Sequence, residues 1–390
     1  MKPAPKIGLA LSGGGARAMA FHLGCLRALH DRGVLDKVSV LSTVSGGSVI
    51  GALYAFNDEP FEAFEKRVEA ALRRGLLWGI VRHTLLSPET PKIVVAIIAG
   101  GLMTLLGRIV QLVGVLLRLV GIGRRFVPRL AEAILDVVPR FASRTTAFER
   151  HLAKRYFGDR RMNDVARKGL NVVINAAELR TESAFRFGSQ ETATWRFGRL
   201  TAAPRVAMAV AASAAFPALL PAIDRRLEFE KKGVRSVQRA IITDGGVYDN
   251  FGISCLVPGR SGEFASNVFP VEFIIACDAG AGIPSGARRP YFIGSRMLAT
   301  TMTIHRRTQT LMQNLLHRMA ANGEIDGFLL PYLGMQDDRL PARPTDLVTR
   351  EEAADYPTDF SPMATSDIRK LSQRGEQLTR CLLDAYASHL

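Results

Sequence analysis

Short apolar runs, each about the length of a strand and separated by helix-like stretches, constrain the fold of this chain most strongly. They cover residues 7–11, 38–43, 170–176, 240–243 and 273–277. Strands of this kind alternating with helices predict an α/β fold in which a mostly parallel sheet is sandwiched by helices. The segment 18–31 is rich in Ala, Leu and Met and is followed by Gly33, so we expect it to be one of these helices.

Length and charge narrow the classes of function. With 390 residues, of which 47% are hydrophobic, the chain can bury one large core or two smaller ones. Its 51 Lys and Arg residues against 36 Asp and Glu residues leave a net charge of +15, which favours polyanionic partners. No zinc-finger spacing, basic region with heptads or aromatic RNA-binding signature is present, so we expect an acidic membrane surface and no nucleic acid. General solubility is an alternative explanation of the excess charge.

The cysteines and the first residues indicate a cytoplasmic protein. Cys25, Cys255, Cys277 and Cys381 are scattered without CxxC pairs, which is typical of reduced thiols. Cys25 and Cys277 lie in apolar runs, where a thiol behaves as a small hydrophobic side chain. Residues 6–12 have the pattern of a short buried strand and not of the apolar centre of a signal peptide, so no secretion signal is expected.

A long insertion between the second and third predicted strands has an unusual centre. Within residues 93–123 the only charged side chains are Arg108 and Arg118, and the longest uncharged stretch is 93–107. Basic residues gather at the two ends of this segment: Lys92, Arg124, Arg125 and Arg129. A spanning helix needs roughly 18 apolar residues, and an arginine in mid-bilayer costs about 2.5 to 3.5 kcal/mol, so a simple transmembrane helix is disfavoured. We expect peripheral membrane contact through about 93–125, with a lid helix pair packed on the catalytic domain as the alternative.

These features divide the chain into three regions. Residues 1–59 and 165–300 are predicted to form one catalytic domain, into which residues 60–164 are inserted as a lid or membrane-interface element. Residues 301–390 are expected to form a C-terminal helical region that carries little information about the chemistry.

Three successive glycines follow the first strand and open the first helix. Gly13, Gly14 and Gly15 remove every Cβ from a tight turn, so their N–H groups can point at one small anion while the helix N-terminus adds positive potential. An oxyanion hole requires such a nest of amides. A phosphate-binding loop is the alternative, but the segment matches neither G-x-x-x-x-G-K-[ST] nor G-x-G-x-x-G.

A second strand end turns into a helix at Ser45, where a nucleophile elbow would place its serine. Gly46 and Gly47 follow it, so the serine can occupy a strained, exposed turn and the next helix can approach closely. The pattern resembles G-x-S-x-G, except that Thr43 replaces the first glycine and demands more room beneath the elbow. A plain helix N-cap is the alternative role for Ser45. Ser42 within the strand and Ser48 within the first helical turn are the rival hydroxyls.

A third strand ends on Asp244, and Gly245 and Gly246 let the chain turn away so that the carboxylate faces the mouth of the sheet. None of the histidines follows a strand end in a loop: His22, His30, His83, His151, His305, His317 and His389. A serine hydrolase without a histidine base needs a carboxylate in direct contact with the serine. The ordinary pKa of aspartate is about 3.9, so the site must desolvate this carboxylate. Asp278, at the end of another strand, is the rival acid.

The three blocks, in this order, resemble the signature of patatin-like phospholipases. A fourth block, Ala-Ser-Ala-Ala-Phe-Pro at 212–217 with Pro221 just beyond, resembles the segment that precedes the catalytic acid in that family. The resemblance covers residues 6–56 and about 165–300. It implies the patatin-like acyl hydrolase fold, Ser45 as nucleophile and Asp244 as base. It also implies that the amides of Gly13, Gly14 and Gly15 are oxyanion donors, with Arg17 nearby.

The function expected from these features is hydrolysis of acyl esters of lipids, such as phospholipids or lysophospholipids, through a Ser–Asp dyad. No metal and no cofactor is expected, because no His, Cys or acidic ligands are clustered in the sequence. Two alternatives stay open. They are an acyltransferase that uses the same acyl-serine, and a catalytically silent, membrane-associated scaffold.

Overall fold

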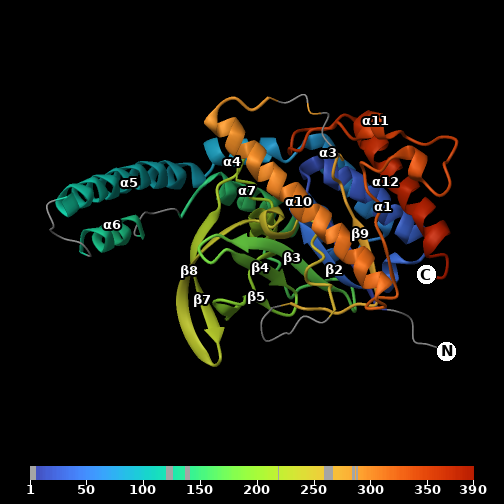
Figure 1. Cartoon of the computed structure of the whole chain (residues 1–390), viewed down its shortest axis with the longest axis horizontal. Helices are drawn as coiled ribbons and strands as arrows, with labels where there is room; N and C mark the ends of the chain where they lie inside the picture. Colours follow the sequence, from blue (N-terminus) through green and yellow to red (C-terminus); the bar gives the residue numbers. More distant parts are fainter. Residues whose placement is uncertain are drawn as a thin grey trace.

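The computed structural model describes residues 6–119, 126–136, 141–217, 219–258, 267–282, 286 and 289–390. Its centre is a ten-stranded mixed sheet in the order β10-β9-β1-β2-β3-β4-β5-β6-β7-β8 (Figure 1). Neighbouring strands are parallel in the first half of this order: β10 (Gly327–Leu329), β9 (Phe273–Cys277), β1 (Ile7–Leu11), β2 (Val38–Val44) and β3 (Asn171–Glu178). Most of these strands are almost fully buried, which explains why their sequences read as continuous apolar runs.

The other half of the sheet is antiparallel, so the expectation of a mostly parallel sheet is wrong for it. Its strands are β4 (Ser183–Gly188), β5 (Thr192–Thr194), β6 (Gly198–Leu200), β7 (Ile223–Lys231) and β8 (Val234–Asp244). The end of β8 also pairs with β3, where Ala176 lies opposite Asp244. Strands β7 and β8 are accessible over most of their length, and β5 and β6 have three residues each. A search for continuous apolar runs therefore finds only the buried end of β8.

Helices cover the parallel half of the sheet. The first helix, α1 (Gly15–Asp31), packs along α12 (Thr365–Tyr386), while α2 (Gly46–Ala55) and α3 (Phe61–Arg74) contact α1 beside it. The crossing of α1 and α12 is close because a Cβ on Gly24 would lie 1.7 Å from the Ser372 carbonyl oxygen. Gly33 has φ +66° and donates its N–H to His30, as expected of a residue that ends a helix.

The region after residue 300 is continuous with the sheet and its core. The boundary expected at 300/301 falls inside α10 (Ile293–Ala321), β10 extends the sheet beside β9, and α12 belongs to the main core. This region also contains the short helices η3 (Asp337–Arg339) and α11 (Arg350–Ala353). Its strand is only three residues long, which explains why its sequence reads as helices and loops.

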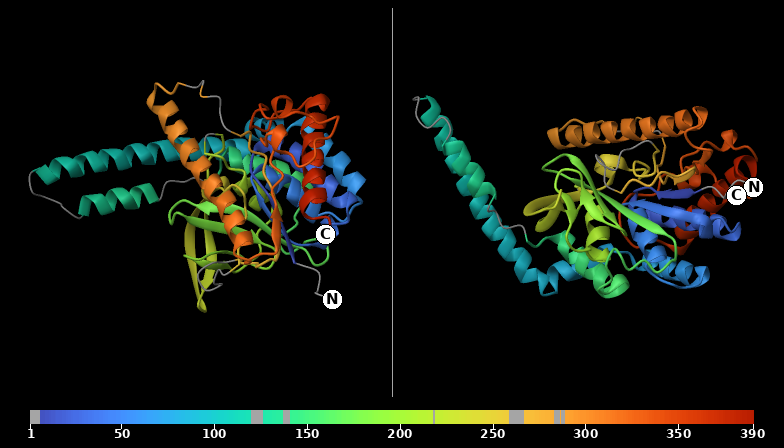
Figure 2. Two further views of the ribbon diagram at one scale, coloured as in Figure 1. Left: turned by 45° about the vertical axis from the view of Figure 1, so that its right-hand side comes forward. Right: turned by 90° about the horizontal axis from the view of Figure 1, so that it is seen from below.

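The insertion divides into helices that join the core and an arm that leaves it. Its helices are α3, α4 (Leu77–Leu85), α5 (Glu89–Leu119), α6 (Phe126–Asp136), α7 (Arg144–Leu152) and the π-helical turn η2 (Ala153–Phe157). Phe64 on α3 and Phe148 on α7 are fully buried in the main core. By contrast, α5 and α6 project together from the body of the molecule (Figures 1 and 2). The alternative of a lid pair packed on the catalytic domain is therefore not the arrangement observed.

Two contacts define this arm. At its base Ile93 and Ala96 form a small apolar cluster with Ala142 and Ala147, and further out a Cβ on Gly114 would lie 2.6 Å from Val127 of α6. Among the described helices, Glu89–Leu117 is the one long and apolar enough to cross a membrane, and only 17% of its most apolar window is buried. It is thus not a core helix of the body. Residues 120–125 of the segment predicted to contact a membrane lie outside the described residues.

Candidate active site

Ser45 lies between β2 and α2 in a backbone conformation that a side chain rarely adopts. Its φ is 51° and its ψ is −118°, which indicates the strained turn of a nucleophile elbow. Ser45 occupies the N-cap position of α2, but its side chain caps no N–H group of the helix. The two rival hydroxyls are fully buried and occupied, because Ser42 donates to the Gly252 carbonyl and Ser48 bonds to Thr43 and Ser213. Ser45 is therefore the serine of this segment that the structure leaves available for chemistry.

The glycines around Ser45 let two chain segments meet without side chains between them. A Cβ on Gly46 would lie 2.2 Å from the Gly15 carbonyl oxygen, and one on Gly47 would lie 2.4 Å from that of Leu11. Thr43 finds its room at Gly51, where a Cβ would approach the Thr43 methyl group to 2.5 Å. Thr43, which departs from the G-x-S-x-G pattern, is thus accommodated because Gly51 on α2 has no side chain.

Asp244 ends β8 and is buried beside Ser45, near enough for the Ser45 side chain to stabilise its carboxylate. Its Oδ1 also accepts the N–H of Gly246 at 2.6 Å. Burial raises the pKa of Asp244 to about 7, and the hydrogen bonds from Gly246 and Ser45 offset part of that effect. A carboxylate with this pKa can take a proton from a hydroxyl near neutral pH. This proximity of hydroxyl and carboxylate is the geometry that the dyad requires.

The sharp turn after Asp244 depends on the two glycines that follow it. A Cβ on Gly245 would lie 2.3 Å from the Asn175 carbonyl oxygen, and one on Gly246 would lie 2.7 Å from Asn250 Oδ1. The turn leads into α9 (Gly246–Asp249), and the buried Asp249 carboxylate accepts three backbone N–H groups beyond it. The loop is therefore held at both ends, which fixes the position of the acid.

Ser213 connects the elbow to the acid and carries a role that spacing alone does not reveal. It is the serine of the fourth block and the last residue of α8 (Val206–Ser213). Its Oγ accepts the Ser45 N–H at 3.0 Å and donates to the Asn175 carbonyl at 2.6 Å. Its own carbonyl accepts the N–H of Gly245 at 3.3 Å. One buried residue thus hydrogen-bonds to the residue proposed as nucleophile and to the turn after Asp244.

The glycine turn supplies fewer free amides than its sequence predicts. The N–H of Gly13 donates to the Asn250 carbonyl at 3.2 Å, so it is already occupied. The turn itself is strained, with φ 146° at Gly14 and φ 61° at Gly15. Within the described part of the chain, the N–H groups of Gly14, Gly15 and Gly46 have no hydrogen-bond acceptor. Of the three glycines expected to supply oxyanion donors, Gly14 and Gly15 keep free N–H groups, and Gly46 lies beside them.

Gly13 contributes space in place of a donor. A Cβ at this position would lie 3.2 Å from the Ser45 Cβ and 2.4 Å from Asn250 Oδ1. The backbone of the glycine turn can therefore reach the serine only because residue 13 has no side chain.

Arg17 and the rival acid Asp278 form a separate buried group. Arg17 donates to the Tyr356 carbonyl at 3.0 Å, and burial lowers its pKa while the nearby Asp278 opposes this. Asp278 accepts the N–H of Gly280 at 2.9 Å and lies near Ser12, and burial raises its pKa. The structure thus gives Ser45 a contact with Asp244 and gives Asp278 other partners.

His305 is a site neighbour that the sequence did not single out. It lies on α10, as expected, but its Nδ1 donates to the Gly246 carbonyl at 3.1 Å, next to the acid. Burial lowers its pKa, which favours the neutral ring. The first half of α10 exposes Ile293, Met297 and Ile304, and the helix runs across one side of the sheet (Figure 2). A signal for this contact is missing from the sequence because α10 reaches the acid loop only through the fold.

These elements define an α/β protein in which a serine elbow at Ser45 and the buried acid Asp244 lie where two strands of the sheet end. Human GIVD cytosolic phospholipase A2 shares the fold, with a TM-score of 0.54 and 13% identity over 98% of this chain and 61% of that chain. A family model described as patatin-like phospholipase matches residues 9–256. The chain belongs to the patatin-like phospholipase family, which confirms the resemblance seen in the sequence and supports a hydrolase of lipid esters.

Curated relatives match a short part of the chain. Lysophospholipase NTE1 of Mycosarcoma maydis is 43% identical over 72 residues, which are 18% of this chain and 4% of that protein. Lysophospholipase NTE1 of Kluyveromyces lactis is 36% identical over 75 residues, which are 19% of this chain and 5% of that protein. The chain thus spans a small fraction of these relatives, and the similarity concerns that segment alone.

Proposed function

We propose that this protein hydrolyses acyl esters of phospholipids or lysophospholipids, with Ser45 as nucleophile and Asp244 as base. The observation that carries the proposal is the contact between a hydroxyl on a strained elbow and a buried carboxylate whose pKa is raised to about 7. The free amides of Gly14, Gly15 and Gly46 next to the elbow support it, because they suit a developing oxyanion.

Each step of the proposed reaction moves one proton through Asp244. As the Ser45 Oγ attacks the ester carbonyl carbon, the carboxylate takes its proton and the glycine amides stabilise the negative oxygen. The intermediate collapses when the C–O bond to the alcohol breaks, and Asp244 returns the proton to that leaving oxygen. Water then attacks the acyl-serine, again losing a proton to Asp244, which passes it to the Ser45 Oγ as the fatty acid leaves.

The substrate class follows from the family and from the names of the relatives, both of which concern phospholipids or lysophospholipids. The arm supports membrane contact, because α5 exposes apolar side chains along its length on the side turned away from α6: Ile97, Ile98, Leu102, Leu105, Ile109, Leu112, Val115 and Leu116. We infer that this arm inserts into the lipid surface that holds the substrate.

Substitution of the two proposed catalytic residues tests the mechanism. Ser45→Ala should abolish both hydrolysis of a short p-nitrophenyl ester and labelling by a fluorophosphonate, whereas Ser48→Ala, at the rival hydroxyl, should keep the labelling. Asp244→Asn should silence the enzyme and Asp278→Asn should not. Labelling of folded Ser45→Ala protein would remove this serine from the mechanism. Lack of hydrolysis of any lipid ester by the wild-type protein would leave the scaffold alternative, and diversion of product by an added alcohol would indicate acyl transfer.

Liposome flotation tests the membrane role of the arm. Ile98 and Leu105 on α5 are 62% and 61% exposed, and Val234 and Val237 on the β7–β8 hairpin are 68% and 64% exposed. Replacing the first pair by Glu should release the protein from anionic vesicles, while the same replacement of the second pair should not. Equal binding of both variants would mean that the arm is not the membrane contact.

A further inference from the structure

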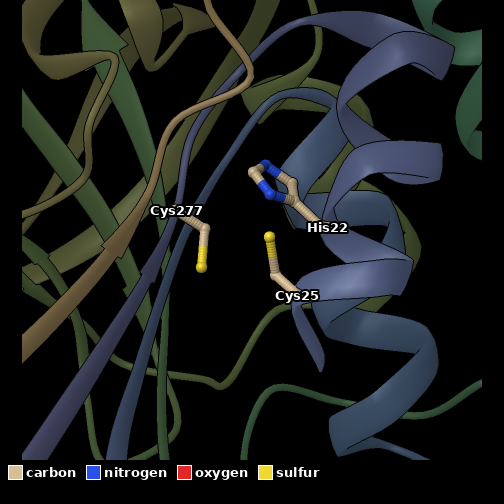
Figure 3. A group of neighbouring side chains, drawn as sticks. All are labelled: His22, Cys25 and Cys277. Carbon is tan, nitrogen blue, oxygen red and sulfur yellow. The ribbon is translucent and has the colours of Figure 1, made fainter. Parts of the chain in front are cut away.

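Three potential metal ligands meet in the main core, and the proposed reaction uses none of them. His22 and Cys25 lie one turn apart on α1, and Cys277 is the last residue of β9, opposite Leu11 in the register of the sheet. One nitrogen of His22 and the two sulfur atoms all lie within 4.8 Å of one another, and all three residues are buried. Figure 3 shows the imidazole ring facing the two sulfur atoms from the helix side. Because helix and strand are both part of the core, the three ligands are held on rigid elements.

The tautomer of His22 leaves a lone pair directed at this group. Its Nε2 lies 3.0 Å from the Ser12 carbonyl oxygen, which can only accept, so Nε2 carries the proton. The other nitrogen, Nδ1, is buried and has no hydrogen-bond partner among the described residues. A histidine that ligates a metal typically donates its second ring N–H to a carbonyl or carboxylate in this way. The unpaired Nδ1 is therefore an acceptor prepared for a cation.

The two thiols of this group lie close together in the core, and the thiolate is the form of cysteine that binds a metal. Cys255 and Cys381 are buried as well, but they lie outside this group and serve as internal comparisons.

We propose that His22 Nδ1, Cys25 Sγ and Cys277 Sγ form a binding site for a thiophilic closed-shell metal ion, Zn²⁺ or Cu⁺. Metal–sulfur and metal–nitrogen bonds of about 2.3 and 2.0 Å place the ligand atoms of a trigonal site about 3.7 to 4.0 Å apart. The observed limit of 4.8 Å therefore requires each pair to close by less than about 1 Å. Sulfur and imidazole ligands select soft ions over Ca²⁺ or Mg²⁺. Binding releases the thiol protons to solvent, so that two thiolates and one neutral imidazole hold the ion.

The two candidate ions satisfy different features of the site. With Zn²⁺ the complex of two thiolates and a neutral imidazole has no net charge, which suits a buried site. With Cu⁺ the complex carries one negative charge, but three ligands suffice for its coordination. Separate titrations with Zn²⁺ and with Cu⁺, each against a chromogenic chelator, distinguish these cases.

The site lies next to the glycine turn and is expected to steady it. Ser12, which precedes Gly13, donates its N–H to the Cys277 carbonyl at 3.1 Å and accepts from His22 through its own carbonyl. A bound ion would hold both partners of Ser12 in place. Metal binding itself does not depend on the proposed hydrolysis, so it can be measured independently of activity.

The test uses the reduced full-length protein and four variants. The wild-type protein and Cys381→Ala should each bind one ion per chain, whereas Cys25→Ala, Cys277→Ala and the double variant should bind at least about a hundred-fold more weakly. X-ray absorption of the loaded wild-type protein should show two sulfur ligands and one nitrogen ligand. This measurement needs no variant, so a folding defect in the alanine variants cannot mask the answer.

Several results would overturn the proposal. One is equal binding by the wild-type protein and the folded double variant, and another is a metal shell of nitrogen and oxygen alone. Failure of the wild-type protein to compete with the chelator for either ion would show that the cluster is an ordinary part of the core. A catalytically inactive wild-type protein that still binds one ion through sulfur would refute the proposed function and leave the metal site intact.

Discussion

Replacement of Asp244 by asparagine should abolish catalysis but raise stability, because the charged form of this proposed base is buried and lowers the free energy of unfolding. Burial raises the pKa of Asp244 from 3.8 to about 7, against the opposing effect of its hydrogen bonds with Gly246 and Ser45. The folded protein therefore binds this proton more tightly than the unfolded chain does. Since the native state holds the extra proton, the free energy of unfolding falls as the pH rises from about 4 to about 7.

The magnitude follows from the size of the shift. About three pKa units at about 1.36 kcal/mol each mean that ionised Asp244 lowers the free energy of unfolding by about 4 kcal/mol at pH 8. Asparagine has nearly the same shape, carries no charge, and can still accept the Gly246 N–H that Asp244 accepts at 2.6 Å. With about 1 kcal/mol lost at the Ser45 hydrogen bond, we expect Asp244→Asn to gain about 3 kcal/mol at pH 8. The gain should fall below about 1 kcal/mol at pH 5.

Urea unfolding followed by circular dichroism at pH 5 and pH 8 measures both values, and ester hydrolysis measures the loss of activity. Asp249→Asn is the matched control, because Asp249 is a buried carboxylate nearby that accepts the N–H groups of Phe251, Gly252 and Ser254. It should lose stability at both pH values. If Asp244→Asn is no more stable than the wild-type protein at pH 8, or still hydrolyses esters, the reasoning about this carboxylate is wrong.

Three further predictions concern the same site. The rate of ester hydrolysis should rise with one ionisation near pH 7 and level off above it, because protonated Asp244 accepts no proton; a rate that stays constant down to pH 5 contradicts this. Gly47→Ala places a Cβ 2.4 Å from a backbone carbonyl oxygen and should cost about 2 kcal/mol of stability and most of the activity. Gly101→Ala is the control, because its added Cβ meets nothing within 4 Å and should raise the free energy of unfolding by up to about 1 kcal/mol. Equal changes in stability for the Gly47 and Gly101 variants would refute the packing argument. Ser213→Ala removes the acceptor that lies 3.0 Å from the buried N–H of Ser45, so it should lower the free energy of unfolding by about 2 kcal/mol. It should also lower kcat more than it raises KM, and an unchanged kcat would exclude a positioning role for Ser213.

The positions that could be predicted are those where the local backbone restricts the residue type. Ser45 was placed at an elbow because small residues follow a buried strand, and its φ of 51° agrees with that placement. The glycine turn was predicted for the same reason, and Gly14 and Gly15 have the positive φ values that a turn without side chains permits. The parallel strands were predicted because a strand buried on both faces has a continuous apolar sequence.

The features that were missed depend on contacts between distant parts of the chain. The hydrogen bond from the Gly13 N–H to the Asn250 carbonyl joins two distant segments, and His305 reaches the acid loop only because α10 crosses the sheet. The antiparallel strands β5, β6 and β7 were missed because the first two have only three residues and the third is accessible over most of its length, so none of them has a long apolar run.

The family, the parallel half of the sheet and the turns on which Ser45 and Asp244 lie can be predicted from short sequence patterns, because each depends on a few neighbouring residues and their backbone conformation. Three other features can be seen only in the folded chain. They are the free amides of the glycine turn, the departure of α5 and α6 from the body as an arm, and the position of Cys277 opposite His22 and Cys25. These features follow from packing between elements that are far apart in the chain. Short sequence patterns do not specify how such elements align or how closely they approach each other.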